Sequence, residues 1–227
     1  MGLNAHDPRI YTPELLRLVS YPRTGSHWFR IIMEYYTGNP SFVQGFFTNN
    51  FTNVWGYHIH DRVVGNNTIN REPGSDMVLH KELKKVIYLY RNPIDTIYSM
   101  LKYDGIFSKE NFNKISNEYY NHLNVWLNDS ENDEIIYITY EEMKNNPHKL
   151  FKSVFNFMNI KYDGGKLDTA LKSSTKEKTV EVVKGNHAVM DKEQFENKVK
   201  YLQEKLDFVV NNAEEIINKF KRVYYVN

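Results

Sequence analysis

The sequence of 227 residues contains no cysteine, which excludes disulfide bonds and thiolate ligands for a metal. It contains no apolar run long enough to cross a bilayer, and residues 1–7 do not have the pattern of a signal peptide. We therefore expect no membrane span and a cytoplasmic location. An excess of charge of one sign is also missing, because 29 basic and 28 acidic side chains leave a net charge of +1. This balance gives no electrostatic reason to expect a nucleic-acid partner.

No Pro-rich or Ser-rich linker and no internal repeat divides the chain, so residues 1–227 are expected to form a single domain around one sizeable core. Strand-like and helix-like patterns alternate, which favours an α/β fold. The prediction is a three-layer domain with a central, mostly parallel sheet flanked by helices. Strands are expected near residues 15–20, 55–60, 86–90 and 134–139, and helices near residues 26–37, 93–103, 114–127, 147–158 and 192–221.

The last of these expected helices has apolar residues at helical spacing from Leu202 to Phe220. Packing of this stripe against the sheet is the expected explanation. A seam between two copies of the chain is the alternative, so a homodimer stays an open hypothesis.

The first segment that carries chemistry is residues 20–28, with the sequence Ser-Tyr-Pro-Arg-Thr-Gly-Ser-His-Trp. It follows an apolar run that predicts a buried strand, and it opens an apolar-periodic stretch that predicts a helix. A turn that contains Gly25 lets backbone N–H groups converge on an anion at the helix N-terminus. Arg23 adds a fixed positive charge with a planar fork of donors. The segment therefore predicts a phosphate-binding corner between a strand and a helix.

P-loop kinases and ATPases are the main alternative for such a corner. Their pattern, Gly-x-x-x-x-Gly-Lys-Ser/Thr, is absent, and no Lys-Ser or Lys-Thr pair follows Gly25. The lysine that contacts phosphate and the hydroxyl that binds magnesium are therefore both missing. A nucleotide kinase or other phosphotransferase that uses ATP and magnesium remains the second hypothesis.

A second corner is predicted at residues 91–99, which read Arg-Asn-Pro-Ile-Asp-Thr-Ile-Tyr-Ser and follow a short β-rich run. Asn92 followed by proline is a typical start of a helix. Asp95 favours the positive end of that helix. Ser99 lies on the same helical face and can offer its hydroxyl to the same anion as Arg91. Two such corners in one chain predict a ligand with two separate phosphate groups.

Together the two segments resemble the motifs of sulfotransferases that use 3′-phosphoadenosine 5′-phosphosulfate (PAPS). The first resembles that family's Tyr-Pro-Lys-Ser-Gly-Thr-x-Trp loop, with Arg23 at the lysine position and Ser26 at the threonine position. The second has the family's Arg-Asn-Pro-x-Asp-x-x-x-Ser pattern. The resemblance implies a fold like that of P-loop NTPases. It also implies PAPS as the sulfuryl donor, adenosine 3′,5′-bisphosphate (PAP) as the product, and no requirement for a metal.

The resemblance also implies roles for individual residues. Arg91 and Ser99 are implied to hold the 3′-phosphate, and Arg23 to neutralise the leaving group with help from nearby backbone amides. Trp28 is implied to stack on the base, with core packing as the alternative. Residues 137–147 resemble the family's Tyr-Glu-Asp-Leu/Met-Lys-x-x-Pro segment, which implies that Tyr140 contacts the adenine. The implied donor-binding residues are Arg23, Thr24, Gly25, Ser26, His27, Trp28, Arg91, Ser99, Tyr140 and, from a late segment similar to the family's Arg-Lys-Gly, Lys184 and Gly185.

A catalytic base is expected between the two phosphate motifs, where the family has a histidine in a Lys-Thr-His segment. Aligning His58-Ile59-His60 with that segment makes His60 the base and places His58 at the lysine position. A histidine suits this role because its ordinary pKa lies near neutral pH. His58 and His80, in the same interval, are the alternative bases. A solvent-facing strand histidine and a metal-binding His-x-His pair are simpler interpretations of His60.

The implied function is in-line transfer of a sulfuryl group to a hydroxyl or amine of a small-molecule or glycan acceptor. Aromatic residues gather between Phe42 and Tyr57 and again between Tyr103 and Tyr120. Both groups can line an acceptor pocket or belong to the core, so the acceptor stays open. A degenerate member of the family that binds PAP without catalysis is a third hypothesis.

Overall fold

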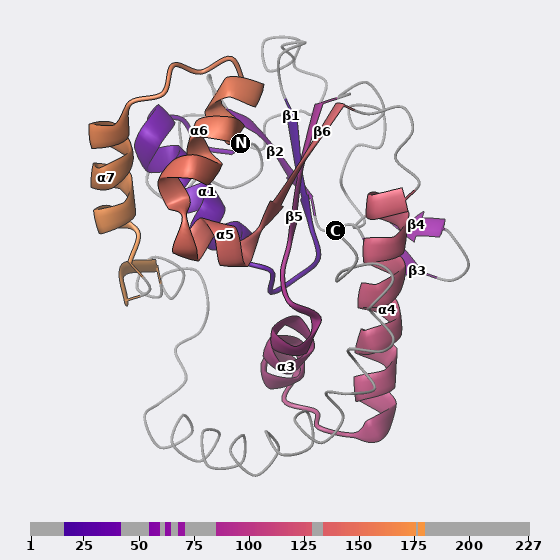
Figure 1. The fold of residues 1–227 in the computed structure, drawn as a ribbon. Helices are drawn as coiled ribbons and strands as arrows, with labels where there is room; N and C mark the ends of the chain where they lie inside the picture. The colour runs from indigo at the N-terminus through magenta and orange to yellow at the C-terminus, as the bar shows by residue number, and fades with distance from the viewer. Residues whose placement is uncertain are drawn as a thin grey trace, which may run out of the picture.

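The computed structural model describes residues 16–41, 55–59, 62–64, 68–70, 85–128, 134–175 and 177–179, with the backbone alone at 57–59, 62–64 and 68–70. A parallel sheet of four strands, in the order β2-β1-β5-β6, forms its centre (Figure 1). Parallel neighbours need long crossover connections, which usually contain helices. The strands are β1 (Leu16–Ser20), β2 (Gly56–Ile59), β5 (Lys85–Tyr90) and β6 (Glu134–Thr139).

Helices cover both faces of this sheet. Successive residues of a strand point to opposite faces, so Leu18 packs in one apolar cluster and Val19 in the other. The Leu18 cluster includes residues of α1 (Ser26–Thr37), α5 (Tyr140–Asn145), α6 (Pro147–Phe157) and α7 (Gly164–Ser173). The Val19 cluster includes residues of α3 (Pro93–Asp104) and α4 (Lys109–Asn128). The predicted three-layer α/β fold is confirmed.

The predicted strands and most predicted helices lie close to their expected positions, but α4 begins earlier than expected. It starts at Lys109 instead of residue 114 because Ser108 caps it. The Ser108 hydroxyl accepts from the N–H of Asn111 at 3.1 Å, and its carbonyl oxygen accepts from the N–H of Phe112 at 2.9 Å. The helix expected at 192–221 lies outside the described residues.

Four short elements were not predicted: α5, α7, and the antiparallel pair β3 (Arg62–Val64) and β4 (Thr68–Asn70). Helix α5 begins with a capping box between Thr139 and Glu142, a signal that the sequence does contain. Helix α7 begins with two glycines, which disfavour a helix. Its start is stabilised by Asp163, whose side chain accepts from the N–H of Lys166 at 3.0 Å.

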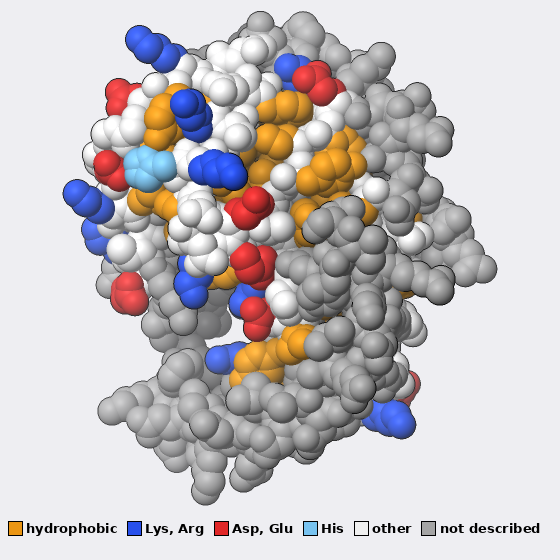
Figure 2. Space-filling view, in the orientation of Figure 1, with side chains coloured by type: hydrophobic (Ala, Val, Ile, Leu, Met, Phe, Trp, Pro, Cys, Tyr) orange, Lys and Arg blue, Asp and Glu red, His pale blue; other side chains and the backbone are white. Residues whose placement is uncertain are grey.

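The described surface carries charges of both signs. On the face shown in Figure 2, Lys and Arg side chains are interspersed with Asp and Glu side chains over the helices α5, α6 and α7. This agrees with the balanced composition of the chain. Among the described helices, none combines the length and the apolar character that a membrane span requires.

Candidate active site

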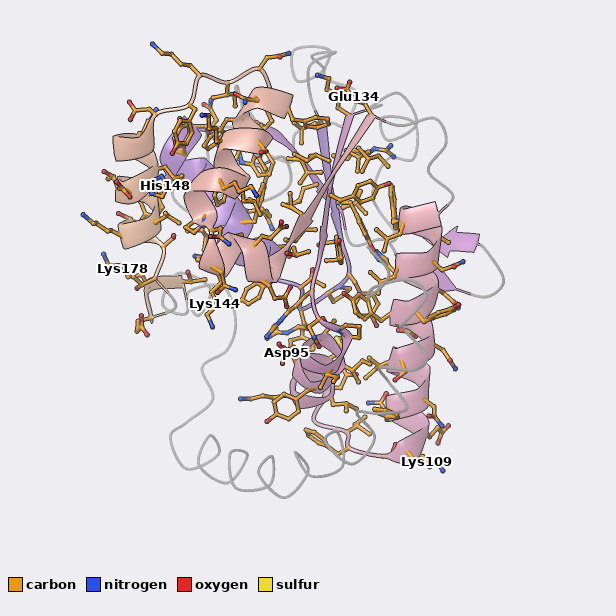
Figure 3. All side chains as sticks on the ribbon, in the orientation of Figure 1. Asp95, Lys109, Glu134, Lys144, His148 and Lys178 are labelled. Atoms are coloured by element: carbon orange, nitrogen blue, oxygen red, sulfur yellow. The ribbon has the colours of Figure 1, made fainter. Side chains whose placement is uncertain are left out.

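Three strand-to-helix corners lie at one edge of the sheet. Because β1, β5 and β6 are parallel, their carboxyl ends lead at the same edge into α1, α3 and α5 (Figure 1). Asp95 marks this edge in Figure 3, in the first turn of α3 and close to the end of β5. Ligands of open α/β sheets bind outside the carboxyl ends of the strands. The three motifs predicted from the sequence therefore lie together.

The first corner, between β1 and α1, contains two residues with left-handed backbone. Arg23 has a φ of 70° and Gly25 a φ of 104°. Thr24 is fully buried, and its hydroxyl donates to the carbonyl oxygen of Tyr21 at 2.7 Å. Gly25 is the N-cap of α1, and no side chain among the described residues caps this helix. The first-turn amides of a helix have no acceptor within it, so an uncapped start suits an anion. Ser26 and His27 are the first two residues of this helix.

Gly25 is in close contact with Tyr140, the first residue of α5 in the third corner, between β6 and α5. A Cβ added at this position would lie 2.5 Å from Cδ2 of Tyr140 and 3.0 Å from its Cε2. The positive φ of Gly25 also disfavours any other residue. Both the turn and the neighbouring ring therefore require glycine here.

The second corner, between β5 and α3, is held by two hydrogen-bonding side chains. Oδ1 of Asn92 accepts from the N–H of Ile94 at 2.9 Å and from that of Asp95 at 3.5 Å, which confirms the predicted N-cap. The N–H of Asn92 donates to Oε1 of Glu141 at 3.0 Å. Glu141 follows Tyr140 in the third corner, so it ties the second corner to the third. Its role was not predicted, because a motif does not show which backbone group a carboxylate reaches.

Side chains from the first two corners meet in one cluster, which we call the arginine cluster: Arg23, Arg91, Asp95 and Ser99. Nε of Arg23 donates to Oγ of Ser99 at 3.3 Å. Nη1 of Arg91 donates to the carbonyl oxygen of Arg23 at 3.4 Å. Nη2 of Arg91 lies 3.6 Å from Oδ2 of Asp95. Residues that the sequence assigned to two separate phosphate corners are thus in direct contact.

The arginine cluster carries an excess of positive charge. Arg23 has an exposed side chain, but desolvation by the surrounding protein lowers its pKa. Tyr103 opposes this shift, and the charge of Arg91 adds to it. Cζ of Arg23 also lies 5.1 Å from the centroid of the Tyr103 ring, a distance typical of a cation–π contact. Within the described part of the chain, Asp95 is the only carboxylate that forms an ion pair with either arginine. An anionic ligand would therefore be favoured here.

Two aromatic rings lie beside this cluster. Trp28 is half-buried and packs edge to face against Tyr140, with ring centroids 5.8 Å apart. Cζ of Arg91 lies 4.5 Å from the centroid of the Tyr140 ring. Nε1 of Trp28 and Nε of Arg91 are buried without a hydrogen-bond partner among the described residues. Leaving a buried donor unpaired is costly, so the site suits a ligand that supplies acceptor atoms.

The region of the proposed base is described only in part. Strand β2 ends at Ile59, whose register partner in β1 is Val19, so β2 runs to the same edge as the first corner. The backbone of His58 pairs with Leu18 in the same ladder. The predicted site residues outside the described part of the chain are His60, Lys184 and Gly185, together with the alternative base His80.

The aromatic groups considered for an acceptor pocket include several core residues. Trp55 is 6% exposed and packs edge to face on Phe29, with centroids 6.0 Å apart. Phe112 and Tyr119 are also buried in the core. Tyr103, beside Arg23, is 63% exposed. Among these residues, core packing therefore explains all but Tyr103.

Comparison with known proteins relates the chain to one family. The family model of the sulfotransferase domain matches residues 13–223. Sulfotransferase 2A6 of Mus musculus is 24% identical over 88% of this chain and 78% of its own length. Sulfotransferase 2A6 of Rattus norvegicus is 27% identical over 81% of this chain and 73% of its own length. The amine sulfotransferase of Oryctolagus cuniculus is 21% identical over 75% of this chain and 64% of its own length.

Solved structures show the same fold. The mouse sulfotransferase SULT7A1, crystallised with PAP, superposes with a TM-score of 0.55 at 19% identity, over 80% of this chain and 70% of that chain. Retinol dehydratase, in complex with androsterone and the inactive cofactor PAP, superposes with a TM-score of 0.53 at 11% identity, over 86% of this chain and 81% of that chain. Because the family model matches most of the chain, this chain belongs to the sulfotransferase family and is a sulfotransferase enzyme.

Proposed function

We propose that this sulfotransferase uses PAPS as its donor and transfers the sulfuryl group to the hydroxyl or amine of a small-molecule or glycan acceptor. The observation that carries the proposal is the contact of Arg23 with Ser99 and of Arg91 with the backbone of Arg23. Two phosphate-binding corners joined in this way suit one nucleotide with two separate phosphate groups. Mouse SULT7A1 and retinol dehydratase were both solved with PAP, the product expected from this donor.

Each part of the donor has a proposed partner. Arg91 and Ser99 bind the 3′-phosphate through charge-assisted and hydroxyl hydrogen bonds. Arg23 and the segment from Thr24 to Trp28 bind the phosphate that leaves with PAP. Trp28 and Tyr140 contact the adenine, where stacking on an aromatic ring is worth about 1–3 kcal/mol. Two further residues, Lys184 and Gly185, are proposed to close over the 3′-phosphate.

The proposed transfer breaks the bond between sulfur and the bridging oxygen and forms a bond between sulfur and the acceptor atom. The acceptor gives its proton to a base, for which we propose His60 because β2 runs to this edge of the sheet. Negative charge develops on the bridging oxygen, where Arg23 and the first-turn amides of α1 stabilise it. These groups account for the chemistry without a metal ion. We also propose that residues 1–227 form one domain and that the enzyme acts in the cytoplasm.

Calorimetric titration of the purified protein tests this proposal, with PAP, AMP, and ATP plus magnesium as ligands. We expect PAP to bind more tightly than AMP, because only PAP offers a 3′-phosphate to Arg91 and Ser99, and we expect EDTA to leave its affinity unchanged. A preference for ATP with magnesium would favour a phosphotransferase instead. Binding of PAP without turnover of PAPS on a panel of alcohols, phenols, sugars and amines would favour a degenerate, non-catalytic member.

A further inference from the structure

Helix α4 carries none of the predicted motifs, yet one of its buried side chains reaches the second corner. Tyr119 is 0% exposed. Its hydroxyl donates to the carbonyl oxygen of Arg91 at 2.6 Å and accepts from the N–H of Arg91 at 3.0 Å. A single hydroxyl thus satisfies both backbone groups of Arg91, the first of the two residues between β5 and α3.

The ring of the same tyrosine contacts the first corner. The rings of Tyr119 and Tyr21 have centroids 4.9 Å apart, and Tyr21 is the residue that follows β1. Tyr21 is fixed in turn, because its hydroxyl donates to Oε2 of Glu118 at 3.1 Å and its carbonyl oxygen accepts from Thr24 at 2.7 Å. Tyr119 therefore lies between the two phosphate corners, with its ring on one and its hydroxyl on the other.

We propose that Tyr119 is a positioning residue that holds Arg91 at the distance from the first corner at which both phosphate groups of the donor are bound. The proposal rests on the role proposed above for Arg91 at the 3′-phosphate. The sheet ladder between β5 and β6 ends at Tyr90 and Thr139, so its pairing does not hold the backbone of Arg91. Without the hydroxyl, two backbone groups would need new partners, and the guanidinium would move with them.

The protonation state of Tyr119 agrees with this role. Burial raises the pKa of its phenol, so the hydroxyl keeps the proton that it donates to Arg91. The neighbouring amide, of Asn92, is held separately by Glu141. In addition to the Asn92 cap, the corner is thus fixed by one side chain from α4 and one from α5.

Tyr88 is a matched control for a purely structural effect. It is also 0% exposed and lies in the same apolar cluster as Tyr119. Its hydroxyl bonds to Nδ1 of His122 at 2.8 Å and does not contact the backbone of Arg91. Replacing either tyrosine by phenylalanine removes one buried hydroxyl, but only the change at Tyr119 alters the second corner.

The experiment compares Tyr119→Phe, Tyr88→Phe and Arg91→Ala in the full chain, with calorimetric affinities for PAP and AMP and thermal midpoints. We expect both phenylalanine variants to lower the midpoint. Only Tyr119→Phe should reduce the preference for PAP over AMP, by about fivefold or more, in the range expected for a misplaced hydrogen-bonding group. In the Arg91→Ala background, Tyr119→Phe should reduce this preference no further.

An unchanged preference for PAP in a folded Tyr119→Phe protein would overturn the inference, since a merely structural role changes the midpoint alone. If Arg91→Ala itself left the preference unchanged, the proposed role of Arg91 would fail instead, so the two failures are distinguishable. Should Tyr119→Phe not fold, hydrogen exchange of the wild-type protein tests the same contact. The Arg91 amide should exchange slowly, because it donates to the buried Tyr119 hydroxyl at 3.0 Å. Exchange of this amide at the rate of an exposed one would also overturn the inference.

Discussion

The guanidinium carbon of Arg91 lies 4.5 Å from the centroid of the Tyr140 ring. Arg91 begins the β5–α3 corner and Tyr140 begins α5, so this cation–π contact joins two corners of the site. One partner is proposed to bind the 3′-phosphate and the other to contact the adenine. We therefore expect the two subsites to respond together when either side chain is changed.

Replacing Arg91 by alanine should weaken the binding of PAP more than that of AMP. The substitution removes a charge-assisted contact worth about 1.5–3 kcal/mol, which only the 3′-phosphate makes. Calorimetry with both nucleotides measures the difference. Lys102→Ala is the control, because it removes a positive charge from an exposed position on α3, the helix that follows Arg91. Equal losses for PAP and AMP in Arg91→Ala would refute the assignment.

Replacing Gly25 by alanine should destabilise the protein and weaken PAP binding. Its φ of 104° already disfavours alanine, and the new Cβ would also meet the Tyr140 ring at 2.5 Å. Gly38→Ala is a matched control, since Gly38 has a φ of 76° but no atom lies within 4 Å of an added Cβ. That control should cost about 1–2 kcal/mol from backbone conformation alone and leave PAP binding unchanged.

The difference between the denaturant midpoints of Gly25→Ala and Gly38→Ala measures how much the clash with the Tyr140 ring destabilises the protein. In a Tyr140→Ala background, Gly25→Ala should cost no more stability than Gly38→Ala, because the clashing ring is gone. Similar midpoints for Gly25→Ala and Gly38→Ala would show that the loop moves away from Tyr140 at little cost.

At Arg23, charge should matter more than shape. Arg23→Met removes the proposed stabilisation of the leaving group, and we expect kcat to fall by roughly 10²–10³, as when one preorganised donor is lost elsewhere. Arg23→Lys keeps the positive charge, so it should retain most of the activity. It loses only the planar guanidinium, which contacts Ser99 and Tyr103. The rate at which PAP is released from PAPS in the presence of an acceptor measures the activity of both variants. Near-normal turnover in Arg23→Met would exclude this role.

Replacing His60 by alanine should lower turnover by about 10²–10⁴, the usual contribution of a general base. The affinity for PAP should be almost unchanged, because the base acts on the acceptor and not on the nucleotide. His80→Ala is the comparison. If His80→Ala abolished turnover and His60→Ala did not, the base would have to be reassigned.

Local signals predicted the corners well, because the residues that form them are neighbours in the chain. The Asn92 cap bonds to amides two and three residues away. The capping box of Thr139 and Glu142 spans three residues in the same way, although the short helix that it starts was not predicted. Helix α7 escaped prediction for the opposite reason, since its two leading glycines weaken the local signal.

By itself, the sequence determined the α/β order of elements and the positions of the two strand-to-helix corners, since periodicity, capping and turn signals depend on neighbouring residues. Only the tertiary structure decided which side chains meet across those corners. Arg23 and Ser99 are 76 positions apart, Asn92 and Glu141 are 49 apart, and Arg91 and Tyr119 are 28 apart. Parallel pairing brings the carboxyl ends of the strands to one edge, and packing of α4 brings Tyr119 there. No local pattern encodes a contact of this kind, because its energy exists only once distant segments are packed together.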